Sequence, residues 1–202
     1  MTAQDIQYRS VQLYGGAMAA DLPTTYSDVS DIRQVPDHQE VYLDTQGYSS
    51  IIFEILQRVE IPDGEAALKH HLADLVAEDM NDMKIWSCSG PAVVPSLHPR
   101  SDQAEKVQAW TILATTPPGE KMRGREREPA FVGVLLTMVR LVEVETDFLV
   151  VVNVPHVPGE FEEGSVDAVT GKMGPLLERA VAIREKVLGT LEVRDWGLFG
   201  EE

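Results

Sequence analysis

The residues with the clearest capacity for chemistry are carboxylates gathered in one short stretch of the chain. Between residues 28 and 43, four acids stand at short intervals around Pro36, and a fifth follows as Glu54. The four are Asp28, Asp31, Asp37 and Glu40. Pro36 restricts its own backbone and that of the preceding residue, and aspartates can accept hydrogen bonds from nearby amides in local turns. We therefore expect an ordered acidic loop that can pair with cations or with a basic protein surface.

Carboxylates at this spacing also occur in general acid–base catalysis, but the surrounding sequence does not favour that use. Asp37 and Glu40 lie in an open, charged stretch that offers little desolvation to separate their pKa values. The chain has no Gly-x-Ser-x-Gly elbow and no His-Glu-x-x-His helix, and the Gly15-Gly16 pair lacks the Lys and Ser/Thr of a phosphate-binding loop. We interpret the protein as a binding protein that has no catalytic site, no cofactor and no bound nucleotide of its own.

Metal and thiol chemistry find little support among the other side chains. His70 and Asp74 are one helical turn apart, which supplies only two ligands for a metal ion. Cys88 is the single cysteine, so it forms no intrachain disulfide, and it has no recognisable His and Asn partners. We predict no metal site and an inert thiol.

The charge of the chain limits its partners. The 202 residues include 33 Asp and Glu against 17 Lys and Arg, a formal net charge of −16. Such a field repels nucleic-acid phosphates and anionic lipid, and it steers a protein toward basic surfaces. The N-terminus lacks a secretory signal pattern, and no apolar run reaches the length of a membrane span. We expect a soluble, intracellular monomer that contacts neither nucleic acid nor membrane directly.

The first half of the chain should position the carboxylates. Apolar residues on both sides of Gly15-Gly16 predict a hairpin over residues 10–22, and residues 40–44 predict a third strand. A helix capped by Ser49 or Ser50 is predicted next, with Glu54 on its exposed flank, from the helical spacing of Ile52, Ile55, Leu56 and Val59. Asp63 should cap a second helix, with His70, His71, Asp74 and Glu78 away from a buried stripe made by Leu68, Leu72, Leu75, Val76 and Met80.

The second half predicts an antiparallel meander followed by a helix. The strands are residues 107–115, 130–143 and 148–154, with a tight acidic turn at 145–147. A helix over 175–188, stopped by Gly189, precedes a short strand at 191–194, and Trp196, Leu198 and Phe199 should fold back as an apolar lid. We predict one domain over residues 1–202, with surface loops at about 87–103, 117–129 and 156–174.

Five segments resemble the Mog family of Ran guanine-nucleotide release factors. They are residues 13–17 (Leu-Tyr-Gly-Gly-Ala), the acidic stretch 28–43, and residues 50–56, 147–155 and 195–199. The resemblance implies an α/β (α+β) fold, a PsbP-like sandwich in which an antiparallel sheet of about six strands packs between helices. This agrees with the number of strands and helices predicted from the patterns.

The resemblance also implies a function. Family members bind the small GTPase Ran and promote release of its guanine nucleotide without a covalent step, in support of nuclear protein import. The resemblance therefore implies that this protein resides in the nucleus and the cytoplasm, mainly in the nucleus. The implied Ran-binding residues are Asp28, Asp31, Asp37, Glu40 and Glu54, with Arg33 supporting the loop through a local ion pair. Gln57 stands where family members often carry a further acid. A small-molecule or ion-binding module on a PsbP-like fold, and a hydrolase of unrecognised type, remain the alternatives.

Overall fold

Two antiparallel sheets form the framework of the protein. The structure is a computed structural model that describes residues 6–30, 35–76, 83–101, 105–117, 128–162 and 164–200. Within these residues, a seven-stranded sheet has the order β3-β4-β5-β9-β8-β7-β6, and a three-stranded sheet has the order β1-β2-β10. The strands are β1 Tyr8–Leu13, β2 Met18–Pro23, β3 Tyr26–Asp28, β4 Gln39–Asp44, β5 Ser50–Gln57, β6 Lys84–Val93, β7 Gln108–Thr116, β8 Phe131–Leu141, β9 Thr146–His156 and β10 Glu192–Val193.

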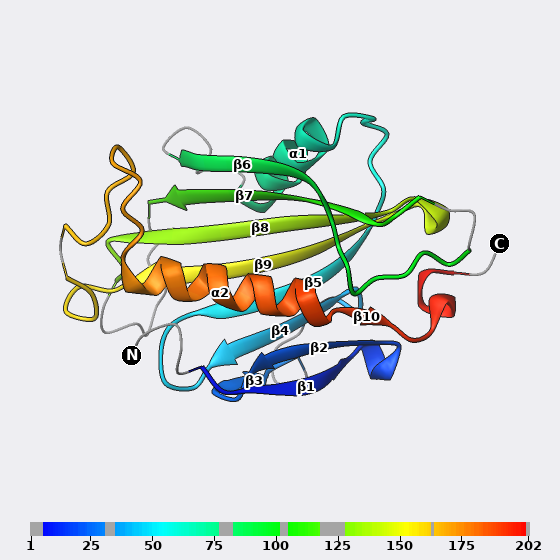
Figure 1. Cartoon of the computed structure of the whole chain (residues 1–202). Helices are drawn as coiled ribbons and strands as arrows, with labels where there is room; N and C mark the ends of the chain where they lie inside the picture. Colours follow the sequence, from blue (N-terminus) through cyan, green and yellow to red (C-terminus); the bar gives the residue numbers. More distant parts are fainter. Residues whose placement is uncertain are drawn as a thin grey trace.

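Two helices cover opposite faces of the large sheet. Helix α1, Gly64–Val76, packs on β6, β7 and β8, whereas α2, Gly174–Thr190, lies along the other face over β8 and β9, beside the small sheet (Figure 1). The central strand β9 alternates between two hydrophobic cores: Phe148 and Val150 join the α2 side, and Leu149 and Val151 join the α1 side. The near-continuous apolar runs of β8 and β9 follow from this burial on both faces.

Most of the predicted elements are confirmed. The hairpin is β1 and β2, joined by the 3₁₀ helix η2, Tyr14–Gly16, where Gly15 adopts a left-handed φ of 66°. The meander is β7-β8-β9. Asp63 caps α1 through a 2.7 Å hydrogen bond from the Ala66 amide. Helix α2 is also confirmed, except that it continues through Gly189, and the Thr190 hydroxyl donates to the Lys186 carbonyl (2.8 Å).

The helix predicted around Glu54 is wrong, because this segment is strand β5. Its side chains alternate instead, with Ile51 and Phe53 facing the α2 core and Ile52 and Leu56 facing the α1 core. A strand buried on both faces carries a continuous apolar run, and such a run also fits a helical spacing. Glu54 therefore lies on a sheet face rather than on a helix flank.

The surface connection predicted from residue 87 is wrong in its first part. Lys84–Val93 forms β6, an edge strand that pairs with β7 and carries two register shifts, one of them between Ser89 and Ala92. Most of its residues are exposed, so the segment lacks the apolar alternation that signals a strand. Irregular edge strands resist pairing with other chains.

The buried stripe of α1 is offset from the predicted one. Ala67, Leu68, His71 and Leu72 are buried, whereas Leu75 is exposed. His71 therefore faces the sheet, contrary to the prediction. Met80 and Glu78 lie outside the described residues, as do residues 118–127 of the surface loop predicted at about 117–129.

Three 3₁₀ helices lie at one end of the large sheet, which we call the turn end (Figure 1). They are η2, η4 (Val142–Val144) between β8 and β9, and η5 (Trp196–Phe199) near the C-terminus. The Arg58 amide after β5 donates to the Glu145 carbonyl at the end of η4 (2.7 Å), and the Asp195 amide before η5 donates to the Ala17 carbonyl after η2 (3.0 Å). Hydrogen bonds thus join η4 to the end of β5, and η5 to η2. In the described part of the chain, no helix is long and apolar enough to span a membrane.

Candidate partner-binding surface

Glu54 lies on β5 near the turn end, beside the start of β4. Gln39 pairs with Glu54 across the two strands, and its side-chain amide donates to Glu54 Oε1 at 2.6 Å. The ring of His38 approaches the same oxygen, with 3.4 Å between Nε2 and Oε1. The Glu54 side chain is only 14% exposed, whereas His38 is about half exposed. The structure thus holds this carboxylate in one orientation, partly shielded from water.

Glu40 points to the opposite face of the sheet, because neighbouring residues of a strand alternate between faces. Its carboxylate accepts hydrogen bonds from the Tyr14 backbone amide and from the Tyr42 hydroxyl (3.4 Å). Burial, reinforced by the negative charge of Glu40, raises the pKa of both tyrosines above their usual range. Glu40 therefore ties the β1–β2 hairpin to β4.

The other predicted acids occupy separate positions. Asp28 ends β3 and is exposed, and its carboxylate accepts a 2.9 Å hydrogen bond from the Ser30 amide, the turn expected for an aspartate here. Asp37 is exposed in the turn closed by the Gln39 amide and the Pro36 carbonyl (2.8 Å). Asp31 and Arg33, including the predicted ion pair of Arg33, lie outside the described residues. The described acids thus lie on or next to the neighbouring strands β3, β4 and β5, but Glu54 and Glu40 are on opposite faces of the sheet.

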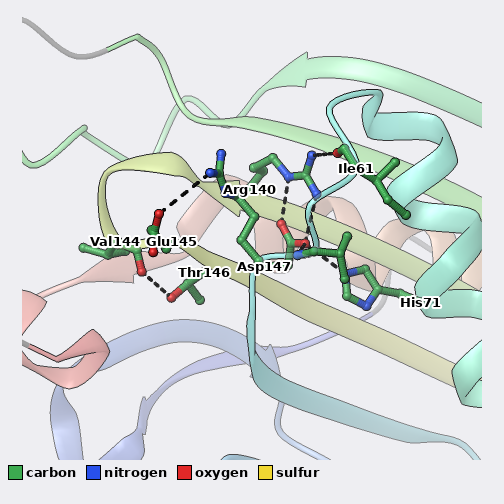
Figure 2. Close-up of polar contacts among 9 residues, drawn as sticks. Ile61, His71, Arg140, Val144, Glu145, Thr146 and Asp147 are labelled. Carbon is green, nitrogen blue, oxygen red and sulfur yellow. Dashed lines mark hydrogen bonds and ion pairs between the residues drawn. The ribbon is translucent and has the colours of Figure 1, made fainter.

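The prediction missed a buried ionic network next to the turn end. Asp147, expected in a turn, is fully buried at the start of β9 (Figure 2). Arg140 of β8 donates to both carboxylate oxygens, from Nε at 2.8 Å and from Nη2 at 3.0 Å. His71 of α1 places Nε2 at 3.0 Å from Oδ2, and an ionised carboxylate only accepts, so this nitrogen carries the proton. A lone Arg within the apolar run 131–141 was the signal available in the sequence.

This network joins the sheet to the connection between β5 and α1. The Val59 amide donates to Asp147 Oδ2 (3.1 Å). Arg140 Nη1 donates to the Ile61 carbonyl (2.8 Å) (Figure 2). Burial alone would raise the pKa of Asp147, but the hydrogen bonds from His71, Arg140 and Val59 outweigh it and lower the pKa to about 2. The residues after Glu54 are therefore anchored by an ionised carboxylate.

Two clefts open at the turn end. The larger, of about 710 Å³, lies between the segment 58–62, the residues leading into β7, and η4, and it is bordered by Trp110 and Trp196. The smaller, of about 570 Å³, lies between the end of β5, η4 and η5. Val142 and Glu143 line both clefts. Both clefts are therefore close to the strand that carries Glu54.

The described residues do not assemble a metal site. No three His, Cys, Asp or Glu side chains in this part of the chain are placed to hold one ion. His70 and Asp74 form an exposed pair, with 3.5 Å between Nε2 and Oδ2. Burial raises the pKa of the Cys88 thiol, which disfavours the reactive thiolate.

An antiparallel sheet between two helices, with a small second sheet beside it, is an α+β sandwich. The family model described as "Ran-interacting Mog1 protein" matches residues 11–155. The chain therefore belongs to the Mog1 family of Ran-interacting proteins.

Individual relatives agree with this assignment. The nuclear import protein mog1 of Schizosaccharomyces pombe is 27% identical over 191 residues, which cover 94% of this chain and 99% of that protein. The Ran guanine nucleotide release factor of Homo sapiens is 32% identical over 150 residues, which cover 73% of this chain and 76% of that protein.

Solved structures share the fold. The Ran-binding protein Mog1p of Saccharomyces cerevisiae superposes with a TM-score of 0.69 at 22% identity, covering 97% of this chain and 100% of that chain. The cyanobacterial PsbP protein of Synechocystis superposes with a TM-score of 0.52 at 9% identity, covering 93% of each chain. The predicted likeness to the PsbP fold is confirmed.

Proposed function

We propose that this chain binds the small GTPase Ran and promotes release of its guanine nucleotide, in support of nuclear protein import. Membership of the Ran-interacting Mog1 family and a formal net charge of −16 support this function. The observation that carries our mechanism is Glu54, a carboxylate on the inner strand β5 that is oriented by Gln39 and partly shielded from water. A shielded carboxylate interacts more strongly with a cation than one in bulk water.

The mechanism is displacement by charge. A GTPase holds its nucleotide with a Lys, backbone amides and Mg²⁺ around the phosphates. A carboxylate brought to that cationic region stabilises it after the phosphates leave, and we assign this role to Glu54. By linkage, a protein that binds empty Ran more tightly than loaded Ran lowers the nucleotide affinity by the same factor, and no covalent step is needed.

The remaining acids take different roles in this proposal. Asp28 and Asp37 are exposed, so they contribute mainly to attraction at long range and to the association rate. Glu40 acts indirectly by holding the β1–β2 hairpin against β4. Asp31 and Arg33 stay predicted contact residues. We further propose that the protein resides mainly in the nucleus, because relatives are named nuclear import proteins.

Release of a fluorescent guanine nucleotide from Ran in a stopped-flow instrument tests this function, with excess unlabelled nucleotide as the chase. We expect the release rate to increase with the concentration of the protein and to saturate. Glu54→Gln should reduce the acceleration at least tenfold, whereas Glu178→Gln, on an exposed position of α2, should leave it unchanged. A release rate equal to the spontaneous rate with the wild-type protein would refute the proposed function.

A further inference from the structure

The two clefts at the turn end share an exposed apolar ridge. Val142, on η4, is 59% exposed and lines both of them. Trp196 borders the larger cleft, and Leu198 and Phe199 border the smaller one, so the ridge has aromatic and aliphatic neighbours on both sides. Exposed apolar residues set in a cleft are a common feature of binding sites.

The wall of the larger cleft is fixed by the backbone around it. A Cβ atom added at Gly64 would lie 2.2 Å from the indole of Trp110, and one added at Gly90 would lie 2.6 Å from it. The indole therefore packs directly against two glycine backbones. Another part of the lining is held by Arg140, which donates to the Ile61 carbonyl and to the buried Asp147. The cleft is thus shaped in advance and does not need a bound ligand to form.

A single strand connects Glu54 with both clefts. Directly after Glu54 in β5, residues 55–57 line the smaller cleft, and the following residues 58–62 line the larger one. The Ile55 amide also donates to the His38 carbonyl (2.9 Å), next to Asp37. A partner that contacts Glu54 from the turn end is therefore close to the clefts that Val142 lines.

The charges around the clefts indicate the chemistry of the occupant. Four glutamates surround them, namely Glu60, Glu105, Glu143 and Glu145. The cations at the rim are Arg58, Arg100 and Lys106, while Arg140 is neutralised by Asp147. Arg58 approaches Glu145 only at 4.0 Å. The rim thus has a small excess of acids, and together with the net charge of −16 on the chain it favours basic residues beside an apolar anchor.

We propose that the two clefts and the Val142 ridge form a second contact site for Ran, which takes an apolar side chain of the GTPase flanked by Lys or Arg. This inference rests on the proposed function and extends it. Glu54 acts on the nucleotide-binding region, and the ridge supplies apolar contact area that holds the complex together. Loss of the ridge therefore raises the dissociation constant but leaves the release rate at saturation near the wild-type value.

Matched valine variants test the ridge. Val142→Ser should weaken Ran binding about fivefold to tenfold, the order expected for burying the exposed part of a valine side chain. Val142→Leu should retain the wild-type affinity. Val169→Ser is the control, because Val169 is 95% exposed and lies in the loop before α2, away from the turn end. Calorimetric titration gives the dissociation constants, and thermal melts verify folding.

Fluorine NMR locates the contact directly. The chain has three tryptophans. Labelled with 5-fluorotryptophan, it should give three signals that Trp→Phe variants assign. Trp110 and Trp196 line the larger cleft, whereas Trp86 donates to the Thr115 hydroxyl (3.0 Å) at the opposite end of β7. On addition of unlabelled, nucleotide-free Ran, the Trp110 and Trp196 signals should shift and the Trp86 signal should not.

The outcomes separate this inference from the proposed function. If Ran binds and its nucleotide release is accelerated, but Val142→Ser binds like the wild type and the Trp110 and Trp196 signals do not move, the second contact site is refuted. The clefts would then remain candidates for a small-molecule ligand. If the wild-type protein does not bind Ran at all, both the proposed function and this inference fail.

Discussion

Replacing Asp147 by Asn tests the buried network more sharply than any surface change. The substitution keeps the size of the side chain but removes its charge, and it leaves the Arg140 guanidinium buried without an anionic partner. One amide oxygen cannot accept all four hydrogen bonds that converge on the carboxylate, which come from Nε and Nη2 of Arg140, from the Val59 amide and from His71. We therefore expect a large loss of stability.

The magnitude follows from two considerations. The pKa of Asp147 is lowered from 3.8 to about 2, and a tenfold change in proton affinity is about 1.4 kcal/mol, so ionisation contributes roughly 2 to 3 kcal/mol to the free energy of unfolding at neutral pH. An uncompensated buried cation adds a desolvation cost, and breaking a buried pair typically costs about 3 to 5 kcal/mol in all. This is a large share of a total stability of about 5 to 15 kcal/mol.

Urea unfolding at pH 7, followed by circular dichroism, measures this loss. The control is Asp74→Asn, because Asp74 is mostly exposed and its ion pair in the described part of the chain is with His70, so its loss should change stability by less than about 0.5 kcal/mol. If Asp147→Asn lowers the free energy of unfolding by less than about 1 kcal/mol, the network does not anchor the β5–α1 connection and our interpretation of it is wrong.

Three further predictions follow from the same geometry. Because folding lowers the pKa of Asp147, the contribution of its charge to the free energy of unfolding is complete above about pH 4 and is lost as the pH falls toward 2. The stability difference between wild type and Asp147→Asn should therefore shrink over that pH range, and an unchanged difference would contradict the assignment. Glu40→Lys should lower the free energy of unfolding by about 1 to 3 kcal/mol, because the Tyr14 amide loses its acceptor, whereas Asp37→Lys should leave it unchanged. Equal melting temperatures for the two variants would refute the role of Glu40 in holding the β1–β2 hairpin against β4. Gly64→Ala should destabilise the protein by about 1 to 3 kcal/mol and change its tryptophan fluorescence, since the added methyl group meets Trp110; wild-type values of both would show that the indole has room to move.

The sequence predicted the elements whose patterns are unambiguous. The meander β7-β8-β9 carries long β-branched runs, and the helix α1 begins at a capping aspartate, so both were predictable. Strand β5 was not, because a strand covered on both faces has no alternation, and its apolar run also satisfies a helical spacing. Strand β6 was missed because an exposed edge strand has little apolar signal to offer.

The candidate site also has features that the sequence predicted and features that it did not. A cluster of acids within one stretch of the chain could be predicted, but their distribution over two faces of the sheet could not, since it depends on the register of β4 against β5. Asp147 and His71 each look like ordinary polar surface residues in the sequence. Only the folded structure brings them to Arg140 from separate elements, so their burial was not accessible to local patterns.

The most direct test of our account is the affinity of the protein for nucleotide-free Ran compared with GDP-loaded Ran, measured for the wild type and for Glu54→Gln. Linkage requires the ratio of the two dissociation constants to equal the factor by which the protein weakens nucleotide binding. We predict that the wild type prefers empty Ran and that Glu54→Gln loses at least tenfold of this preference, while its affinity for loaded Ran changes little. Equal preference in the two proteins would contradict the assignment of Glu54 as the displacing group.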